Sequence, residues 1–137
     1  MIFTESQLAT LRALVDRIIP ADDYPSGWDA GVGEYLARQF ERDLRSHVEL
    51  YRAGLNALES EAQATAGASF VSLNSDAQGA LLSRIEVGDV TTRWPIDPAT
   101  FFRNVVNHTI EGFYSDPANG GNRNAVSWHM IGFQVRA

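Results

Sequence analysis

Apolar side chains recur three and four residues apart along most of this chain, and that spacing restricts its fold more than any other feature does. The first run consists of Leu8, Leu11, Leu14, Val15 and Ile18. Side chains at these intervals lie on one face of an α-helix and form the apolar stripe that faces a core. No segment shows a persuasive strand-like alternation, and no internal repeat is present. The sequence therefore predicts an all-α protein.

Start and stop signals divide this pattern into about five helices. Polar side chains accept hydrogen bonds at helix starts, proline lacks the amide hydrogen of a helix interior, and glycine often ends a helix. The first expected helix runs from the Thr4–Gln7 capping box to Pro20, and the second from about Asp29 to Glu41. The third and longest covers Val48–Ala62 and stops at Gly67. A short fourth helix runs from the Ser75–Gln78 capping box to Gly88, and a fifth follows Asp97-Pro98 and ends at Ser115–Pro117. We expect residues 1–137 to form a single domain with an irregular C-terminal tail.

Composition excludes several classes of function. The chain has no cysteine, so it contains no disulfide, thiolate nucleophile or cysteine-held iron–sulfur cluster. Its net charge of −6 argues against nucleic acid or an anionic membrane as the main partner. No apolar run approaches the ~20 residues that cross a bilayer. No twin-arginine leader is present, which favours the cytoplasm; a leader that was removed, or that a partner carries, would instead favour the periplasm.

The first loop carries two adjacent carboxylates. Asp22 and Asp23 follow the helix that stops at Pro20, where the negative end of the helix dipole disfavours acidic groups. We expect these side chains to accept hydrogen bonds from backbone amides or an arginine in a fixed turn. The alternative is that both carboxylates are freely solvated.

The histidines offer weak candidates for chemistry. Asp43 and His47 lie four residues apart and His108 and Glu111 three apart, so each pair can share a helix face. A metal site needs three or four convergent ligands, and neither pair has a visible third. Solvated or locally hydrogen-bonded side chains are the better interpretation. A self-sufficient small enzyme that uses His108, Glu111 and Asp116 remains an alternative.

Two glycine-containing segments resemble cofactor or metal motifs only superficially. Gly31 and Gly33 match part of a dinucleotide fingerprint, but Leu36 occupies the position of the next glycine and no strand precedes them. Residues 116–124 are rich in oxygen-bearing side chains, yet they lack the ligand spacing and the distal glutamate of an EF-hand. A multiple turn is favoured there. The sequence therefore predicts no catalytic, cofactor-binding or metal-binding residue on this chain.

The order of several short segments resembles the gluconate 2-dehydrogenase subunit 3 family. The matching segments are Leu14-Val15-Asp16-Arg17-Ile18-Ile19-Pro20-Ala21-Asp22-Asp23, Ala30-Gly31-Val32, Tyr51-Arg52-Ala53-Gly54-Leu55, Gly67-Ala68-Ser69-Phe70, Phe101-Phe102, Thr109 to Pro117, Gly120-Gly121-Asn122 and Trp128 to Phe133. Together they span roughly residues 8–133. The chain departs from the family pattern at Asn119, where a tyrosine is frequent, at Ser127, where a glycine is frequent, and in lacking a leader.

The resemblance implies a non-catalytic small subunit. Members of this family pair with a large flavoprotein of the glucose–methanol–choline class, which holds FAD and oxidises a sugar, polyol or sugar acid. A cytochrome c or an iron–sulfur centre accepts the electrons in many complexes. The small subunit is thought to support folding, flavin loading and export of the large one. A chaperone or export escort that leaves the flavoprotein after folding is the alternative.

We expect the C-terminal block to contact the flavoprotein. The apolar residues within 126–133 either fold back on the helical core or bind a partner. Gly120 and Gly121 give the backbone conformations closed to other residues, and a tryptophan is a frequent interface anchor. The predicted partner-binding residues are Glu111, Tyr114, Asp116, Pro117, Gly120, Gly121, Asn122, Trp128 and Phe133.

Overall fold

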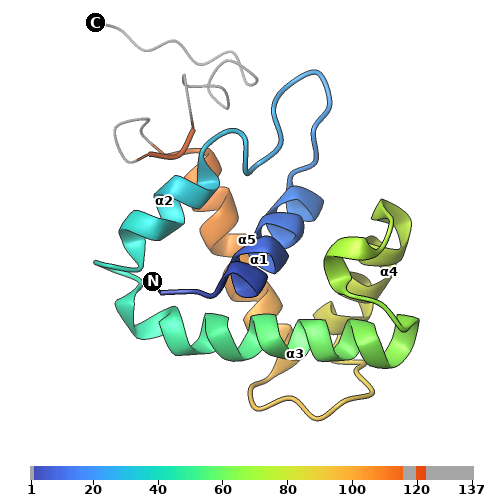
Figure 1. Ribbon diagram of the computed structural model, residues 1–137. Coiled ribbons are helices and arrows are strands. Elements are labelled where there is room, and N and C mark those ends of the chain that lie inside the picture. The colour runs from blue at the N-terminus through green and yellow to red at the C-terminus, as the bar shows by residue number, and fades with distance from the viewer. Residues whose placement is uncertain (1, 116–119, 123–137) are drawn as a thin grey trace, which may run out of the picture.

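The computed structural model describes residues 2–115 and 120–122 of the chain, and this part is all-α (Figure 1). It contains five α-helices and two 3-10 turns, and no strand. The elements are α1 (Glu5–Ile18), α2 (Val32–Gln39), η1 (Arg45–His47), α3 (Val48–Ala66), η2 (Phe70–Ser72), α4 (Ser75–Glu86) and α5 (Pro98–Phe113). The predicted fold class is confirmed, and most of the expected tail lies outside the described residues.

Two helices at the centre organise the core. α1 and α5 contact each other, and both also contact α3 and α4, while α2 packs on α5 (Figure 1). The largest fully buried side chains come from all these helices and from η2. They are Tyr51, Phe70, Phe101, Phe113, Leu11, Leu14, Leu36, Leu55, Leu58, Ile85, Glu61 and Val15. The apolar stripes read from the sequence therefore meet in one core, with a single carboxylate, Glu61, among its largest members.

Most of the predicted helix ends are confirmed. Oγ1 of Thr4 accepts a hydrogen bond from the Gln7 backbone amide, and Oε1 of Gln7 accepts one from the Thr4 backbone amide, which forms the capping box at α1. Asp97 caps α5 through the Thr100 amide at 2.8 Å. Gly67 ends α3 in the left-handed region, with a φ of 66°. These ends form where predicted because each depends on residues within one turn.

Two predicted boundaries are wrong. The second helix was expected from Asp29 to Glu41, but α2 is shorter at both ends, because a turn through Gly31 at φ 103° precedes it and further turns follow it. The N-cap of α4 is Asn74, not Ser75. The side chain of Gln78 donates to the Phe70 carbonyl instead of reaching back to a cap. A tertiary contact has thus replaced the local one.

The buried carboxylate of Glu61 holds the connection between α4 and α5 against α3. Its two oxygens accept hydrogen bonds from the amides and hydroxyls of Thr91 and Thr92, over distances of 2.5–3.0 Å. The indole of Trp94 contacts one of these oxygens at 3.4 Å, and the guanidinium of Arg84 lies 3.7 Å from the other. Burial alone would raise the pKa of Glu61, but the hydrogen bonds from Thr92 and Thr91 outweigh it and lower the pKa to about 2.

The first loop confirms the expected hydrogen bond for one of its two carboxylates. Oδ1 of Asp22 accepts from the Tyr24 amide at 2.9 Å, whereas the described residues offer Asp23 no such bond. We therefore expect Asp22→Ala to lower the free energy of unfolding by about 1 kcal/mol, and Asp23→Ala to change it little. Urea unfolding of both variants measures the difference. Equal destabilisation by the two substitutions would contradict the conclusion that Asp22, and not Asp23, stabilises the turn.

Candidate partner-binding site

The predicted partner-binding residues that the structure describes fall into two groups. Glu111 and Tyr114 are exposed at the C-terminal end of α5. Residues 120–122 are buried against the chain itself. The remaining predicted residues, Asp116, Pro117, Trp128 and Phe133, lie outside the described residues.

The buried segment 120–122 fits closely between α2 and the end of α5. A Cβ atom added at Gly121 would lie 2.3 Å from the Gly112 carbonyl oxygen and 3.0 Å from Cβ of Tyr35. Asn122 is fully buried, and its side-chain amide donates to the Ser115 carbonyl at 2.8 Å. These contacts return the chain to the helical core after α5. The two glycines are therefore required for internal packing, and a role for them in partner binding stays a prediction.

The end of α5 exposes an apolar strip next to this segment. Ile110 and Tyr114 lie four residues apart, so they share a helix face, and their side chains are 44% and 45% exposed. Glu111 is exposed beside them. Large apolar side chains that lie together on a surface are typical of protein contacts. Of the predicted residues that the structure describes, Glu111 and Tyr114 are exposed. Ile110, which was not among the predicted residues, completes the strip.

A buried polar pair joins α3 to α5. The hydroxyl of Tyr51 and Nδ1 of His108 are 2.7 Å apart, and the His47 ring packs edge-on against the His108 ring at 5.1 Å. Burial lowers the pKa of His108, which the nearby Glu111 opposes and His47 reinforces. Burial, with a smaller contribution from Glu111, raises the pKa of Tyr51. The pair is therefore neutral near pH 7 and satisfies two buried polar groups inside the aromatic core.

This arrangement brings together residues that the sequence presented as separate pairs. His47 and His108 are neighbours, although they come from η1 and α5. Among residues 2–115 and 120–122, however, no group of three histidine or acidic side chains is placed to hold a metal ion. Asp116, the third member of the alternative enzyme site, lies outside the described residues. No sequence signal marked the contact between the two rings, because it depends on how η1 and α5 meet in the fold.

A comparison with known protein families places the chain in one of them. The model of the family described as gluconate 2-dehydrogenase subunit 3 matches residues 5–134. The chain belongs to the gluconate 2-dehydrogenase subunit 3 family. No match was found among curated proteins or among solved structures.

Membership in the gluconate 2-dehydrogenase subunit 3 family confirms the resemblance inferred from ordered short motifs. A protein of this family is a subunit of a dehydrogenase complex, so its surface must include a contact with another subunit. Within the described part of the chain, no helix has the length and apolar character of a membrane span.

Proposed function

We propose that this chain is the non-catalytic small subunit of an FAD-dependent sugar or sugar-acid dehydrogenase, and that it supports folding and flavin loading of the large flavoprotein subunit. The observation that carries the proposal is the family match over residues 5–134, nearly the whole chain. In this proposal the large subunit holds FAD and the substrate, and a cytochrome c or an iron–sulfur centre accepts the electrons.

The surface of α5 supports the proposal. Ile110 and Tyr114 are partly exposed, and the side-chain amide of buried Asn122 donates to the carbonyl of Ser115 next to them. A helix end with exposed apolar and aromatic side chains provides the kind of anchor on which protein interfaces depend. Residues 123–137, which follow directly, contain Trp128 and Phe133. In this proposal the flavoprotein binds the strip at Ile110 and Tyr114, and it also binds Trp128 and Phe133.

Co-expression tests the proposed function. The chain and its flavoprotein should purify as a stable complex, and the small subunit should raise the soluble yield and flavin content of the large one. Within that complex, Tyr114→Ser and Trp128→Ala should each weaken assembly by roughly 30- to 1,000-fold, because truncating an aromatic anchor costs about 2–4 kcal/mol. Calorimetric titration measures affinity, and flavin absorbance measures loading.

Three outcomes would contradict parts of this proposal. An unchanged yield and flavin content without the small subunit would overturn its supporting role. Release of the chain after the flavoprotein has folded would favour a chaperone or escort. Normal assembly of both variants with loss of turnover would place the chain close to catalysis. Glu49→Gln, an exposed change on α3 rather than on α5, serves as the control.

A further inference from the structure

A cluster of two histidines and a tyrosine joins three elements at the C-terminal half of α5. His108 of α5 is 8% exposed, and its Nδ1 lies 2.7 Å from the hydroxyl of Tyr51 in α3. The two rings also stack, with centroids 5.8 Å apart. The ring of His47 in η1 packs edge-on against the His108 ring. His108 therefore connects α5 to both α3 and η1.

The surroundings of Tyr51 determine where the proton of this hydrogen bond lies. Its ring is fully buried among three other aromatic side chains, which are Phe3, Phe40 and Phe101. Burial raises the pKa of Tyr51, so the hydroxyl keeps its proton. The acceptor that the described residues offer this hydroxyl is Nδ1 of His108. Because a buried donor needs an acceptor, the hydroxyl donates and Nδ1 carries no proton.

Protonation of His108 is incompatible with this arrangement. An imidazolium donates from both ring nitrogens, so Nδ1 no longer accepts the hydroxyl hydrogen of Tyr51. The added proton also places a positive charge inside the aromatic core, beside the ring of His47. Such a charge is costly unless the ring reaches water or a partner. Acid therefore weakens the junction between α5 and α3.

The groups around His108 give this effect its sign. Burial lowers the pKa of His108; Glu111 of α5 opposes this and His47 of η1 reinforces it, and no group of α1 or α4 is among these causes in the described part of the chain. From α2, Tyr35 joins the cluster, because burial, Glu111 and Asp43 raise its pKa. Since the folded-state pKa of His108 is lowered, the unfolded state binds the proton more readily. The stabilisation is thus complete above pH 6.5 and is lost as pH falls through the folded-state pKa.

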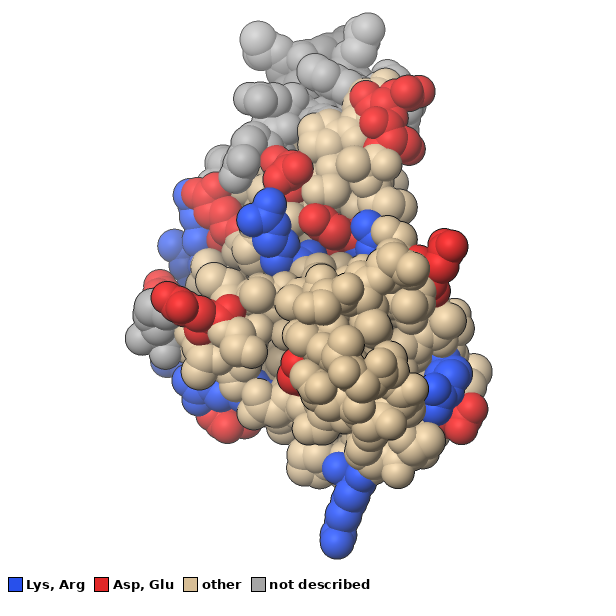
Figure 2. Space-filling view, turned by 45° about the vertical axis from the view of Figure 1, so that its right-hand side comes forward, with Lys and Arg blue, Asp and Glu red and all other residues tan. Residues whose placement is uncertain are grey.

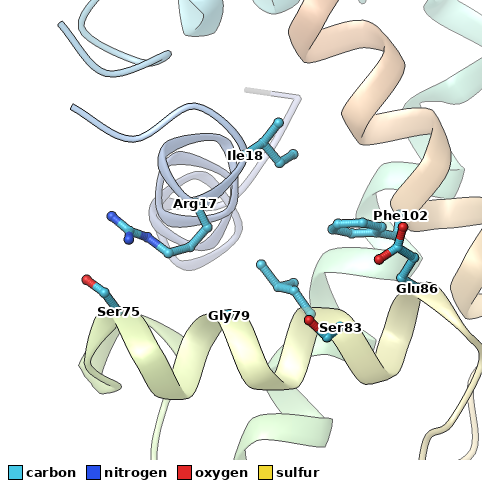
Figure 3. Close-up of a pocket in the computed structure, with 8 residues that line it drawn as sticks. Arg17, Ile18, Ser75, Gly79, Ser83, Glu86 and Phe102 are labelled. Atoms are coloured by element: carbon cyan, nitrogen blue, oxygen red, sulfur yellow. The ribbon is translucent and has the colours of Figure 1, made fainter. Parts of the chain in front are cut away.

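The charged surface on the side of α4 carries arginine and carboxylate side chains. Figure 2 brings this side forward and shows them scattered around a broad area without charge. Arg17 and Glu86 also line the groove between α1 and α4 (Figure 3). Carboxylates ordinarily ionise near pH 4 and guanidinium groups above about pH 12, so histidine is the side chain that titrates between about pH 5 and 7. The chain has three histidines, so each can be tested in turn.

We propose that the hydrogen bond between Tyr51 and His108 is an acid-sensitive latch, which holds the C-terminal half of α5 on α3 while His108 is neutral and releases it when His108 is protonated. The strip at Ile110 and Tyr114 lies at this end of α5, so its position depends on the latch. Acid therefore weakens binding of the large subunit at the strip. This last step rests on the proposed function, because it takes the flavoprotein as the partner.

Urea unfolding of the isolated chain between pH 7 and pH 5 tests the latch without the partner. Below pH 6.5 the equilibrium constant for unfolding should rise by up to about ten-fold per pH unit, the slope for one extra proton in the unfolded state. His108→Gln should remove this rise. His129→Gln, which replaces a histidine outside the described residues, and Glu86→Gln, which removes an exposed carboxylate from the groove, should keep it. A wild-type slope in His108→Gln would overturn the latch.

An NMR titration of the wild-type chain gives a second test, which does not require any variant to fold. It follows the ring signals of the histidines and the backbone amides of α5. The amide signals of residues 108–114 should shift or broaden with the same midpoint as the ring of His108, while those of residues 99–104 at the start of the helix stay constant. Constant signals from residues 108–114 throughout that titration would contradict release of this half of α5.

Calorimetric titration against the flavoprotein at pH 7 and pH 5 tests the effect on docking. The affinity of the wild-type chain should fall at least roughly five-fold more than that of His108→Gln, which lacks the titrating ring. An equal fall in both would overturn the control of docking by the latch while the proposed function stands. Absence of binding at pH 7 would overturn the proposed function, and the measurements on the isolated chain would still decide the latch.

Discussion

Glu61→Ala is expected to lower the free energy of unfolding by about 3–5 kcal/mol, which corresponds to a drop of roughly 10–20 °C in melting temperature. The carboxylate is fully buried and accepts four hydrogen bonds from Thr91 and Thr92. Its removal leaves these donors without an acceptor and releases the loop between α4 and α5 from α3. Thermal unfolding followed by circular dichroism at pH 7 measures the effect.

The same carboxylate makes the stability of the protein depend on acidity. Its pKa is about 2 in the folded state and near its ordinary value of 4.5 in the unfolded state. The unfolded state therefore binds the proton more readily, and the stabilisation is complete above pH 4.5 and disappears as pH falls toward 2. A shift of this size corresponds to about 3 kcal/mol. Glu61→Gln should lose this part of the pH dependence.

A matched change on the same helix provides the control. Glu49 is exposed in α3, with a side chain that is 81% accessible, and it pairs with Arg52. Glu49→Gln should change stability by less than about 1 kcal/mol. If Glu61→Ala is no more destabilising than Glu49→Gln, the loop between α4 and α5 does not depend on the buried carboxylate.

Replacing two helical glycines, Gly54 and Gly79, with alanine is expected to change the free energy of unfolding in opposite directions. A Cβ atom at Gly54 would lie 2.1 Å from Cδ1 of Phe101, where α3 crosses α5. The ring is 1% exposed and packs against Tyr51, so it has little room to move. Gly54→Ala should therefore lower the free energy of unfolding by about 2–3 kcal/mol through overpacking. Gly79→Ala should raise it by roughly 0.5–1 kcal/mol, because its site is open and alanine favours the helix.

Urea unfolding of both alanine variants measures these changes. The comparison holds the chemical change constant, since each adds one methyl group to a glycine within an α-helix. Both variants lose the same backbone freedom in the unfolded state, so the difference between them reports packing alone. A stabilised Gly54→Ala protein would show that α3 and α5 approach each other less closely than in this structure.

The sequence by itself determined the helices and most of their ends. The capping box at Thr4, the aspartate–proline start of α5 and the glycine stop of α3 act within one turn, so they required no knowledge of the fold. It also determined the family, because several short motifs stand in order along nearly the whole chain. Prediction failed at Ser75 and at the ends of α2, where distant contacts or turns replaced the local signal.

The tertiary structure alone decided which side chains act together. Glu61 follows the apolar stripe of α3 at helical spacing, yet its donors lie thirty and more residues away. His47 and His108 became neighbours only because η1 and α5 meet. The groove beside Arg17 likewise exists because small residues of α4 face the end of α1. Caps and apolar periodicity depend on residues that are close in the sequence, so they can be predicted from it. These sites depend instead on the angles and distances at which helices cross, and close packing of core side chains determines those angles and distances.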